Sequence, residues 1–145
     1  MILANMIDAA HASAILARIT QIPIFETLRM DQVVFDAGQC ELRVPRQRMY
    51  DGVFESFHGG ILMTIADSAA CFAVLTTTPA DQIMTTTDMN IRFLAPCLSD
   101  VLVKARLIKR GRLMCPVTVD VLDAADKLVA VAQVNYMLLE RVPRR

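Results

Sequence analysis

The stretch GGILMTIADSAACFAVL, residues 59–75, decides the fold. It is apolar on every side, too long for a strand, and rich in Ala, Leu and Met, which favour a helix. We therefore predict one long helix over these residues. Because it has no hydrophilic face, the helix should be buried, and only a sheet wrapped around it could supply the cover.

The segments on both sides of this helix alternate between apolar and polar residues, as strands with one buried face do. Before the helix, residues 28–44 predict a hairpin with its turn at Gly38. After the break at residues 76–82, further strands are expected over residues 88–93, 101–107, 113–121 and 128–139. The sum is an α+β fold, an antiparallel sheet of five to six strands with the helix across its concave face.

The N-terminal segment should form a short amphipathic helix. Residues 8–20 place Ile15, Leu16 and Ile19 on one side, and Pro23 ends the run. The 145 residues are 54% hydrophobic, enough for one core, so we predict a single domain over residues 1–145 with residues 1–22 as a helical lead-in. The apolar surplus favours an oligomer in which another subunit covers part of the surface.

Charge and cysteine content argue against several function classes. Fifteen basic residues balance fifteen acidic ones, so no overall field would draw the protein to nucleic acid or an anionic membrane. The four cysteines lack the short spacings of zinc or redox sites, and with only two histidines we expect no metal. The first twenty residues show neither a signal peptide nor a membrane anchor, and the protein is expected in the cytoplasm.

Asp67 is the only charged residue between His58 and Asp81. A carboxylate buried in an apolar helix is costly unless something compensates for it. Either it has a structural role, paired with Arg92 or bonded to the neighbouring Ser68 and Thr64 hydroxyls, or it is a functional group.

The helix opens with His58-Gly59-Gly60, where free N–H groups and the positive end of the helix dipole could polarise a carbonyl oxygen. Alternatively, the glycines permit a tight entry into the helix and His58 caps it. Gly59 and Asp67 lie eight residues apart, about 12 Å along a helix, so one carbonyl cannot contact both within a chain. If they cooperate, the site lies across a two-fold interface.

Four motifs together resemble a known family: FHGGILMTIADSAA (57–70), TTTDMNIRFLAP (85–96), the KRGR turn (109–112) and KLVAVAQVNYMLL (127–139). Over residues 23–140 the chain resembles the PaaI-like branch of the hotdog-fold acyl-CoA thioesterases, in the 4-hydroxybenzoyl-CoA thioesterase superfamily. The resemblance implies a sheet wrapped around the central helix, an acyl-CoA substrate and no cofactor. It also implies a homodimer or homotetramer with active sites at the dimer interface.

The resemblance implies roles for individual residues. Asp67 would be the nucleophile or the general base that hydrolyses the thioester. The Gly59 N–H would polarise the thioester carbonyl, with Gly60 beside it in the substrate site. His58 would shape that pocket and orient the leaving group.

Thr86 falls where relatives place a hydroxyl that holds the attacking water. Thr85 and Thr87 are close competitors for this role. The alternation of the strand at residues 88–93, extended backwards, puts Thr86 on the polar face.

One position departs from the family pattern. Relatives commonly carry an asparagine seven residues before the first glycine, where this chain has Gly52 with Asp51 beside it. If a one-residue insertion makes Asp51 the counterpart, an acceptor replaces an amide donor unless Asp51 is protonated. This departure favours an alternative function, a noncatalytic acyl-CoA binding or sensing module, whereas the retained Asp67 favours hydrolysis. Hydratase or dehydratase chemistry would need a different arrangement of His and Asp.

A local group of cations surrounds the turn at Gly111, in a stretch with no acid between Asp100 and Asp120: Lys104, Arg106, Lys109, Arg110 and Arg112. Such a group is large enough to bind a phosphate. With the resemblance, Arg110 and Arg112 are expected to contact the nucleotide end of coenzyme A. For Lys104 and Arg106, a solvated hairpin whose charges discourage edge pairing is an equal alternative.

Overall fold

The computed structural model describes residues 7–140. In chain order the elements are α1 (Ala9–Ile19), α2 (Pro23–Thr27), β1 (Gln32–Asp36), β2 (Gln39–Val44), the short 3-10 helix η1 (Arg48–Tyr50), α3 (Gly59–Leu75), β3 (Ile83–Phe93), β4 (Val101–Leu107), β5 (Met114–Asp123) and β6 (Leu128–Leu139). The helix at residues 59–75 has the predicted bounds, and α1 lies within residues 8–20. Each predicted strand is present, but β3 begins earlier than predicted, at Ile83.

The short helix α2 was not predicted. Pro23 ends the α1 run as expected, but it also occupies the first turn of α2, where the missing N–H of proline is not needed. Phe25 of α2 packs against Phe72 of α3, with ring centroids 6.3 Å apart. The N-terminal segment is therefore attached to the central helix.

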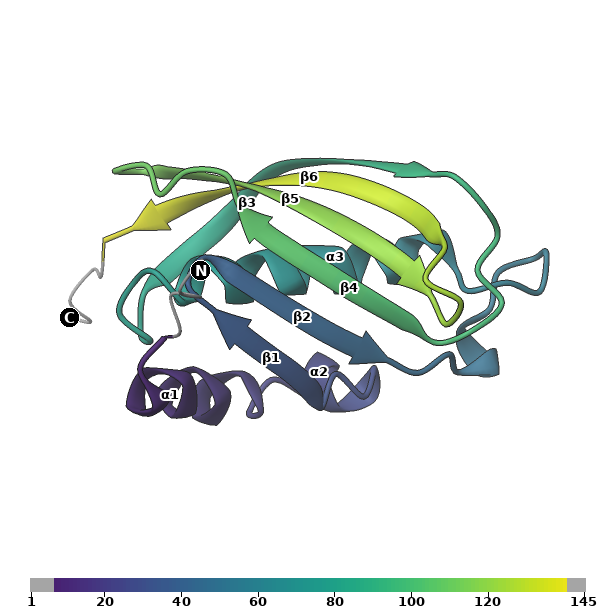
Figure 1. The fold of residues 1–145 in the computed structure, drawn as a ribbon, viewed down its shortest axis with the longest axis horizontal. Coiled ribbons are helices and arrows are strands. Elements are labelled where there is room, and N and C mark those ends of the chain that lie inside the picture. Colours follow the sequence, from purple (N-terminus) through teal and green to yellow (C-terminus); the bar gives the residue numbers. More distant parts are fainter. Residues whose placement is uncertain (1–6, 141–145) are drawn as a thin grey trace, which may run out of the picture.

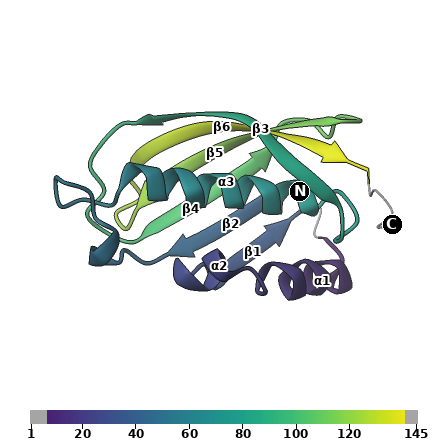
Figure 2. The same cartoon turned by 180° about the vertical axis from the view of Figure 1, so that it is seen from behind.

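The six strands form one antiparallel sheet in the order β1-β2-β4-β5-β6-β3. Figures 1 and 2 show this sheet curved around α3, with α1 and α2 on the β1 side. The predicted α+β arrangement, a sheet of five to six strands around one long helix, is confirmed. β1 and β3 are the edge strands.

Small side chains let α3 lie close to the concave face of the sheet. Ala66, Ala69, Ala70 and Ala73 are fully buried there. The opposite face of α3 is only half-buried and carries mostly polar or sulfur-containing side chains, namely Met63, Thr64, Asp67, Ser68 and Cys71. The prediction of a helix buried on all sides is therefore wrong for this face, which stays partly open.

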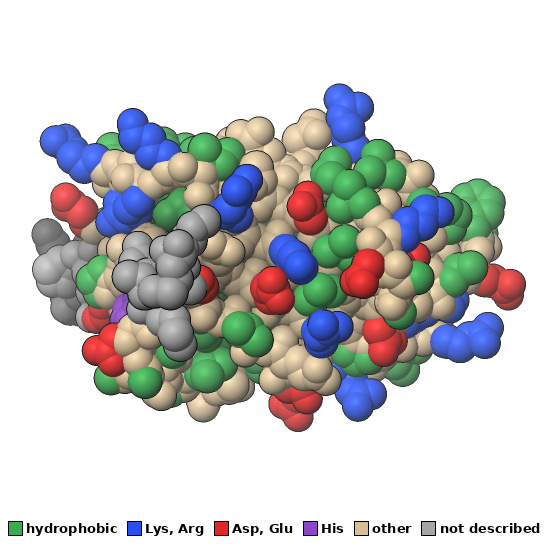
Figure 3. Space-filling view, viewed as in Figure 1, with side chains coloured by type: hydrophobic (Ala, Val, Ile, Leu, Met, Phe, Trp, Pro, Cys, Tyr) green, Lys and Arg blue, Asp and Glu red, His purple; other side chains and the backbone are tan. Residues whose placement is uncertain are grey.

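The outer face of the sheet carries mixed charge. Figure 3 shows Lys and Arg side chains interspersed with Asp and Glu over this face, in agreement with the balanced composition. Lys104 on β4, for example, forms an exposed ion pair with Glu41 on β2 at 3.7 Å. None of the helices within residues 7–140 combines the length and the apolar character needed to cross a membrane.

Candidate active site

The Asp67 carboxylate is held by two neighbouring strands. The Thr86 hydroxyl on β3 donates to Asp67 Oδ1 at 2.8 Å, and the Tyr136 hydroxyl on β6 lies 2.7 Å from the same oxygen. Thr86 and Tyr136 are direct partners in the pairing of β3 with β6, so their side chains reach the helix together. Oδ1 is thereby fixed in place. The Asp67 side chain itself lies on the half-buried face of α3.

A β-bulge explains why Thr86 faces the helix. The register of β3 against β6 shifts between Thr86 and Asp88, and Thr87 and Asp88 are both exposed. The extra residue reverses the alternation, so Thr86 points inward although extension from residues 88–93 placed it on the polar face. That prediction is corrected. Thr87 instead bonds Asp88 on the outer side, which leaves Thr86 as the threonine at Asp67.

The partners that a structural role for Asp67 predicted do not bind its carboxylate. Arg92 is exposed on β3 and forms no ion pair with Asp67 among residues 7–140. The Ser68 and Thr64 hydroxyls each donate to the backbone carbonyl four residues earlier in α3. Asp67 is held instead by Thr86 and Tyr136, which sequence reasoning considered separately or not at all.

Cys71 lies one helical turn after Asp67 on the same face of α3. Burial raises the pKa of its thiol to about 11, and the charge of Asp67 adds to the effect. A thiol in this state is uncharged at neutral pH and is a poor nucleophile. Cys71 is therefore a weaker candidate for a reactive group on this face of the helix than the Asp67 carboxylate.

The start of α3 combines a cap with a free donor. His58 Nδ1 accepts from the Gly60 N–H at 2.9 Å, so the predicted alternative of a histidine cap is confirmed and the Gly60 N–H is occupied. Within the described part of the chain, nothing accepts from the Gly59 N–H, which keeps it available to a carbonyl oxygen. The Phe93 ring lies so close to Gly59 that an added Cβ would be 3.0 Å from its Cζ atom.

An apolar cavity of about 470 Å³ adjoins this end of the helix, lined by Phe54, Ser56, Phe57, Gly59, Leu62, Phe93 and the segment 94–97. Its walls are aromatic and aliphatic, and Gly59 forms part of its surface. An apolar group bound here would bring its polar end next to the free N–H.

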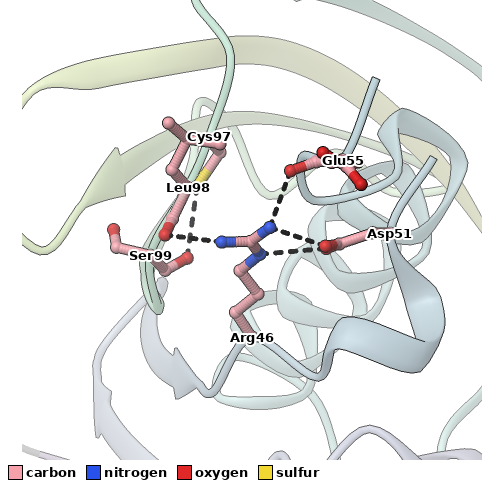
Figure 4. Close-up of polar contacts among 6 residues, drawn as sticks. All are labelled: Arg46, Asp51, Glu55, Cys97, Leu98 and Ser99. Atoms are coloured by element: carbon pink, nitrogen blue, oxygen red, sulfur yellow. Dashed lines mark hydrogen bonds and ion pairs between the residues drawn. The ribbon is translucent and has the colours of Figure 1, made fainter. Parts of the chain in front are cut away.

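Asp51, the residue beside the family's asparagine position, is bound by an arginine. Arg46 forms a two-point interaction with its carboxylate, at 2.9 Å from Nε and 2.6 Å from Nη2, and also bonds the Leu98 and Glu55 carbonyls (Figure 4). The Arg46 hydrogen bonds lower the pKa of Asp51, so it is ionised rather than protonated. Gly52, at the expected spacing, has no side chain, and an added Cβ would be 3.6 Å from His58 Cδ2.

Asp51→Asn should lower the melting temperature at pH 7, because it removes the charge that Arg46 binds. The pKa of Asp51 is depressed in the folded state, so its contribution is present above the ordinary aspartate pKa of about 4 and is lost as pH falls through the lowered value. The gap between variant and wild type should therefore narrow from pH 7 towards pH 3 in thermal melts. Glu26→Gln, an exposed carboxylate on α2, is the matched control and should show little gap at any pH; a constant Asp51→Asn gap would contradict the prediction.

The cationic turn lies at the same end of the sheet as the Asp67 contacts. Cys115, three residues after Arg112, pairs with Tyr136, which in turn pairs with Thr86. Arg110 and Arg112 are exposed, and Arg110 bonds the adjacent Gly111 carbonyl. Lys104 and Arg106 lie further along β4 on the outer face, where Lys104 pairs with Glu41.

Sequence reasoning missed two residues that organise this region, Tyr136 and Arg46. Tyr136 could have been identified from the alternation of β6, in which Val134, Tyr136 and Leu138 all face inward. A tyrosine hydroxyl that faces a core needs a hydrogen-bond partner there. For Arg46 no local pattern showed its full set of partners, because one acceptor, the Leu98 carbonyl, lies 52 residues further along the chain.

Comparison with solved structures gives the class of the fold. A thioesterase family protein from Silicibacter pomeroyi is similar with a TM-score of 0.83 and 21% identity, over 90% of this chain and 99% of that one. The E. coli PaaI protein from the phenylacetic acid degradation operon is similar with a TM-score of 0.80 and 16% identity, over 90% and 94%. The chain thus has the same hotdog fold, as its motifs implied.

The sequence itself places the chain more narrowly. The family described as "Domain of unknown function (DUF4442)" matches residues 10–138, and the chain belongs to this family. A protein provisionally named an esterase, from Saccharolobus solfataricus, is 26% identical over 118 residues, which are 80% of this chain and 83% of that protein.

Proposed function

We propose that this protein is a cytoplasmic acyl-CoA thioesterase that hydrolyses an acyl-CoA to the free acid and coenzyme A. The observation that carries the proposal is the Asp67 carboxylate, fixed through Oδ1 by Thr86 and Tyr136 on the half-open face of the central helix. The fold shared with proteins named thioesterases supports it.

The chemistry starts at the ionised Asp67 carboxylate and has two routes. As a general base, Asp67 takes a proton from water while the water oxygen attacks the thioester carbon; the C–S bond then breaks and the thiolate receives the proton. As a nucleophile, Asp67 attacks the carbon directly, releases the thiolate, and forms an acyl-aspartyl anhydride that water hydrolyses. Label found in Asp67 after a single turnover in isotopically labelled water would establish the anhydride route, because only in that route can water attack the aspartyl carbon.

A complete site requires a second subunit. Gly59 and Asp67 are separated by about 12 Å along α3, so the N–H that polarises the carbonyl comes from Gly59 of the partner subunit. Two features support a two-fold interface here: β3 is an edge strand with one unpaired side, and the half-buried face of α3 borders it. The assembly is a homodimer or a pair of such dimers.

The apolar cavity beside Gly59 supports an apolar acyl group, whose carbonyl would lie at the Gly59 N–H. His58 caps the same helix end and orients the leaving group from there. Gly60 contributes through its backbone in shaping the helix start, since its N–H is taken by His58.

Arg110 and Arg112 are proposed to bind the phosphates of coenzyme A at the mouth of the site. The double variant Arg110→Ala/Arg112→Ala should raise KM for acyl-CoA by roughly three- to thirtyfold, the scale of two exposed ionic contacts, with little change in kcat. KM for the matching N-acetylcysteamine thioester, which lacks the nucleotide, should not change. Lys104→Ala/Arg106→Ala is the charge-matched control; equal effects of both double variants would contradict a specific contact.

The test of the proposed function is thiol release by wild type from acyl-CoA thioesters ranging from acetyl through medium-chain to phenylacetyl. Turnover of any member supports the hydrolase, and the preferred member identifies its acyl group. Binding of the same thioesters without thiol release would instead support a noncatalytic acyl-CoA binding module. The observation that favours this second function is the bare Gly52 beside His58, where relatives carry an asparagine amide.

A further inference from the structure

Tyr136 contacts Asp67 at two atoms. Its hydroxyl oxygen lies 2.7 Å from Asp67 Oδ1 and 2.9 Å from the Asp67 backbone carbonyl oxygen. The side chain comes from β6, is only 5% exposed, and enters from the sheet side of α3. Tyr136 therefore contacts Asp67 from a different element than the helix that carries the carboxylate.

The two oxygens of the Asp67 carboxylate are not equivalent. Oδ1 is bonded by both Thr86 and Tyr136, whereas nothing in residues 7–140 donates to Oδ2. No buried side-chain oxygen in this region lacks a partner, so Oδ2 must reach the surface. The pair of donors thus leaves one carboxylate oxygen free and facing outward.

We infer that Tyr136 is a positioning residue for the proposed hydrolysis, which together with Thr86 holds Asp67 Oδ1 so that Oδ2 is the oxygen that acts on the thioester or its water. This role rests on the proposed function. A carboxylate free to rotate would exchange its two oxygens and lose the alignment that the reaction needs.

Tyr136 can serve as a donor over the whole working range of pH. Burial raises the pKa of its phenol above the ordinary value near 10, and the neighbouring Cys71 and Asp67 add to this shift. The other titratable groups that act here are Cys71, whose own pKa is raised, and Arg18 on α1, which acts on Cys71. Neither supplies a donor to Oδ1, so removal of the Tyr136 hydroxyl leaves Thr86 alone.

The experiment is Tyr136→Phe in the full-length protein, with Tyr50→Phe, the chain's other tyrosine, as the matched control. We expect kcat to fall about ten- to a hundredfold, the value of a hydrogen bond to a charged group, while KM stays within about twofold. Tyr50→Phe should match wild type in both respects.

A purely structural role for Tyr136, tying β6 to α3 through the Asp67 carbonyl, would lower the melting temperature but leave kcat and KM of the folded fraction unchanged. That result, in an active wild type, would overturn the positioning role and leave the proposed function intact. The variant Thr86→Val removes the other donor to Oδ1, and we again expect kcat to fall while KM changes little. Absence of thiol release by wild type would remove the proposed function and this role together.

Discussion

Asp67→Asn is expected to lower kcat/KM for acyl-CoA hydrolysis by at least about 100-fold, the scale of a lost general base or nucleophile. The amide keeps an oxygen that can accept from Thr86 and Tyr136, and its NH₂ group replaces the outward-facing Oδ2. The variant should therefore fold normally. It loses only the charge and the basicity of the open oxygen.

The matched control is Asp120→Asn, an exposed carboxylate on the outer face of β5. It changes the net charge by the same amount and should leave thiol release unaffected. Melting curves of both variants show whether the fold is retained. An Asp67→Asn protein that folds and keeps more than about a tenth of the wild-type rate would rule out Asp67 as the working group.

Mixing two inactive variants should restore activity if the site is shared between subunits. Asp67→Asn lacks the carboxylate and Gly59→Pro lacks the N–H. In a mixed dimer, one site combines both defects, and the other combines the intact Asp67 with the intact Gly59. Random pairing of equal amounts makes half of the dimers mixed, so about a quarter of the wild-type activity should return.

Gly59→Pro is suited to this test because Gly59 is the first residue of α3, where proline is compatible with a helix. The preceding His58 has φ −59° and ψ 128°, a conformation that precedes proline well. The added ring will displace Phe93, whose side chain is half exposed and free to turn. Gly59→Ala introduces the same contact but keeps the N–H, so it should remain largely active.

The mixture is prepared by co-expression with two affinity tags, and the doubly tagged dimer is assayed against each parent. A single chain that held both groups of its own site would show no recovery, since every chain in the mixture carries one defect. Recovery in the doubly tagged fraction alone would place the catalytic carboxylate and the N–H on different subunits.

The sequence predicted the features that depend on hydrophobic pattern. The apolar run at residues 59–75 predicted a long helix packed on a sheet, although one of its faces is only half-buried, and the alternating runs predicted the strands of that sheet. Asp67 was identifiable as a candidate site residue because a single carboxylate in an otherwise apolar helix conflicts with its surroundings. In each case a strong local signal agreed with the requirement for one core.

The features that could not be predicted depend on contacts between distant segments. Tyr136 reaches Asp67 because β6 packs against α3, and it lies next to Thr86 there because β6 pairs with β3; neither neighbour is encoded in the strand alone. The pairing of Arg46 with Asp51 is short in sequence, but the remaining Arg46 bonds depend on how residues 55 and 98 meet. The spacing of Asp51 from Gly59 suggested a substrate contact, whereas its charge serves to hold that loop.

Because of the bulge in β3, the side of the sheet on which the Thr86 hydroxyl lies depends on the number of residues in the strand as well as on the residue at position 86. β3 consists of two halves of opposite phase joined at Thr87, so deleting one residue there would turn one half over relative to the other. A related chain with such a deletion could thus keep the threonine and still lose the hydrogen bond from its hydroxyl to Asp67. Within the family, a gap of one residue at this point would be as informative about activity as a substitution of the aspartate.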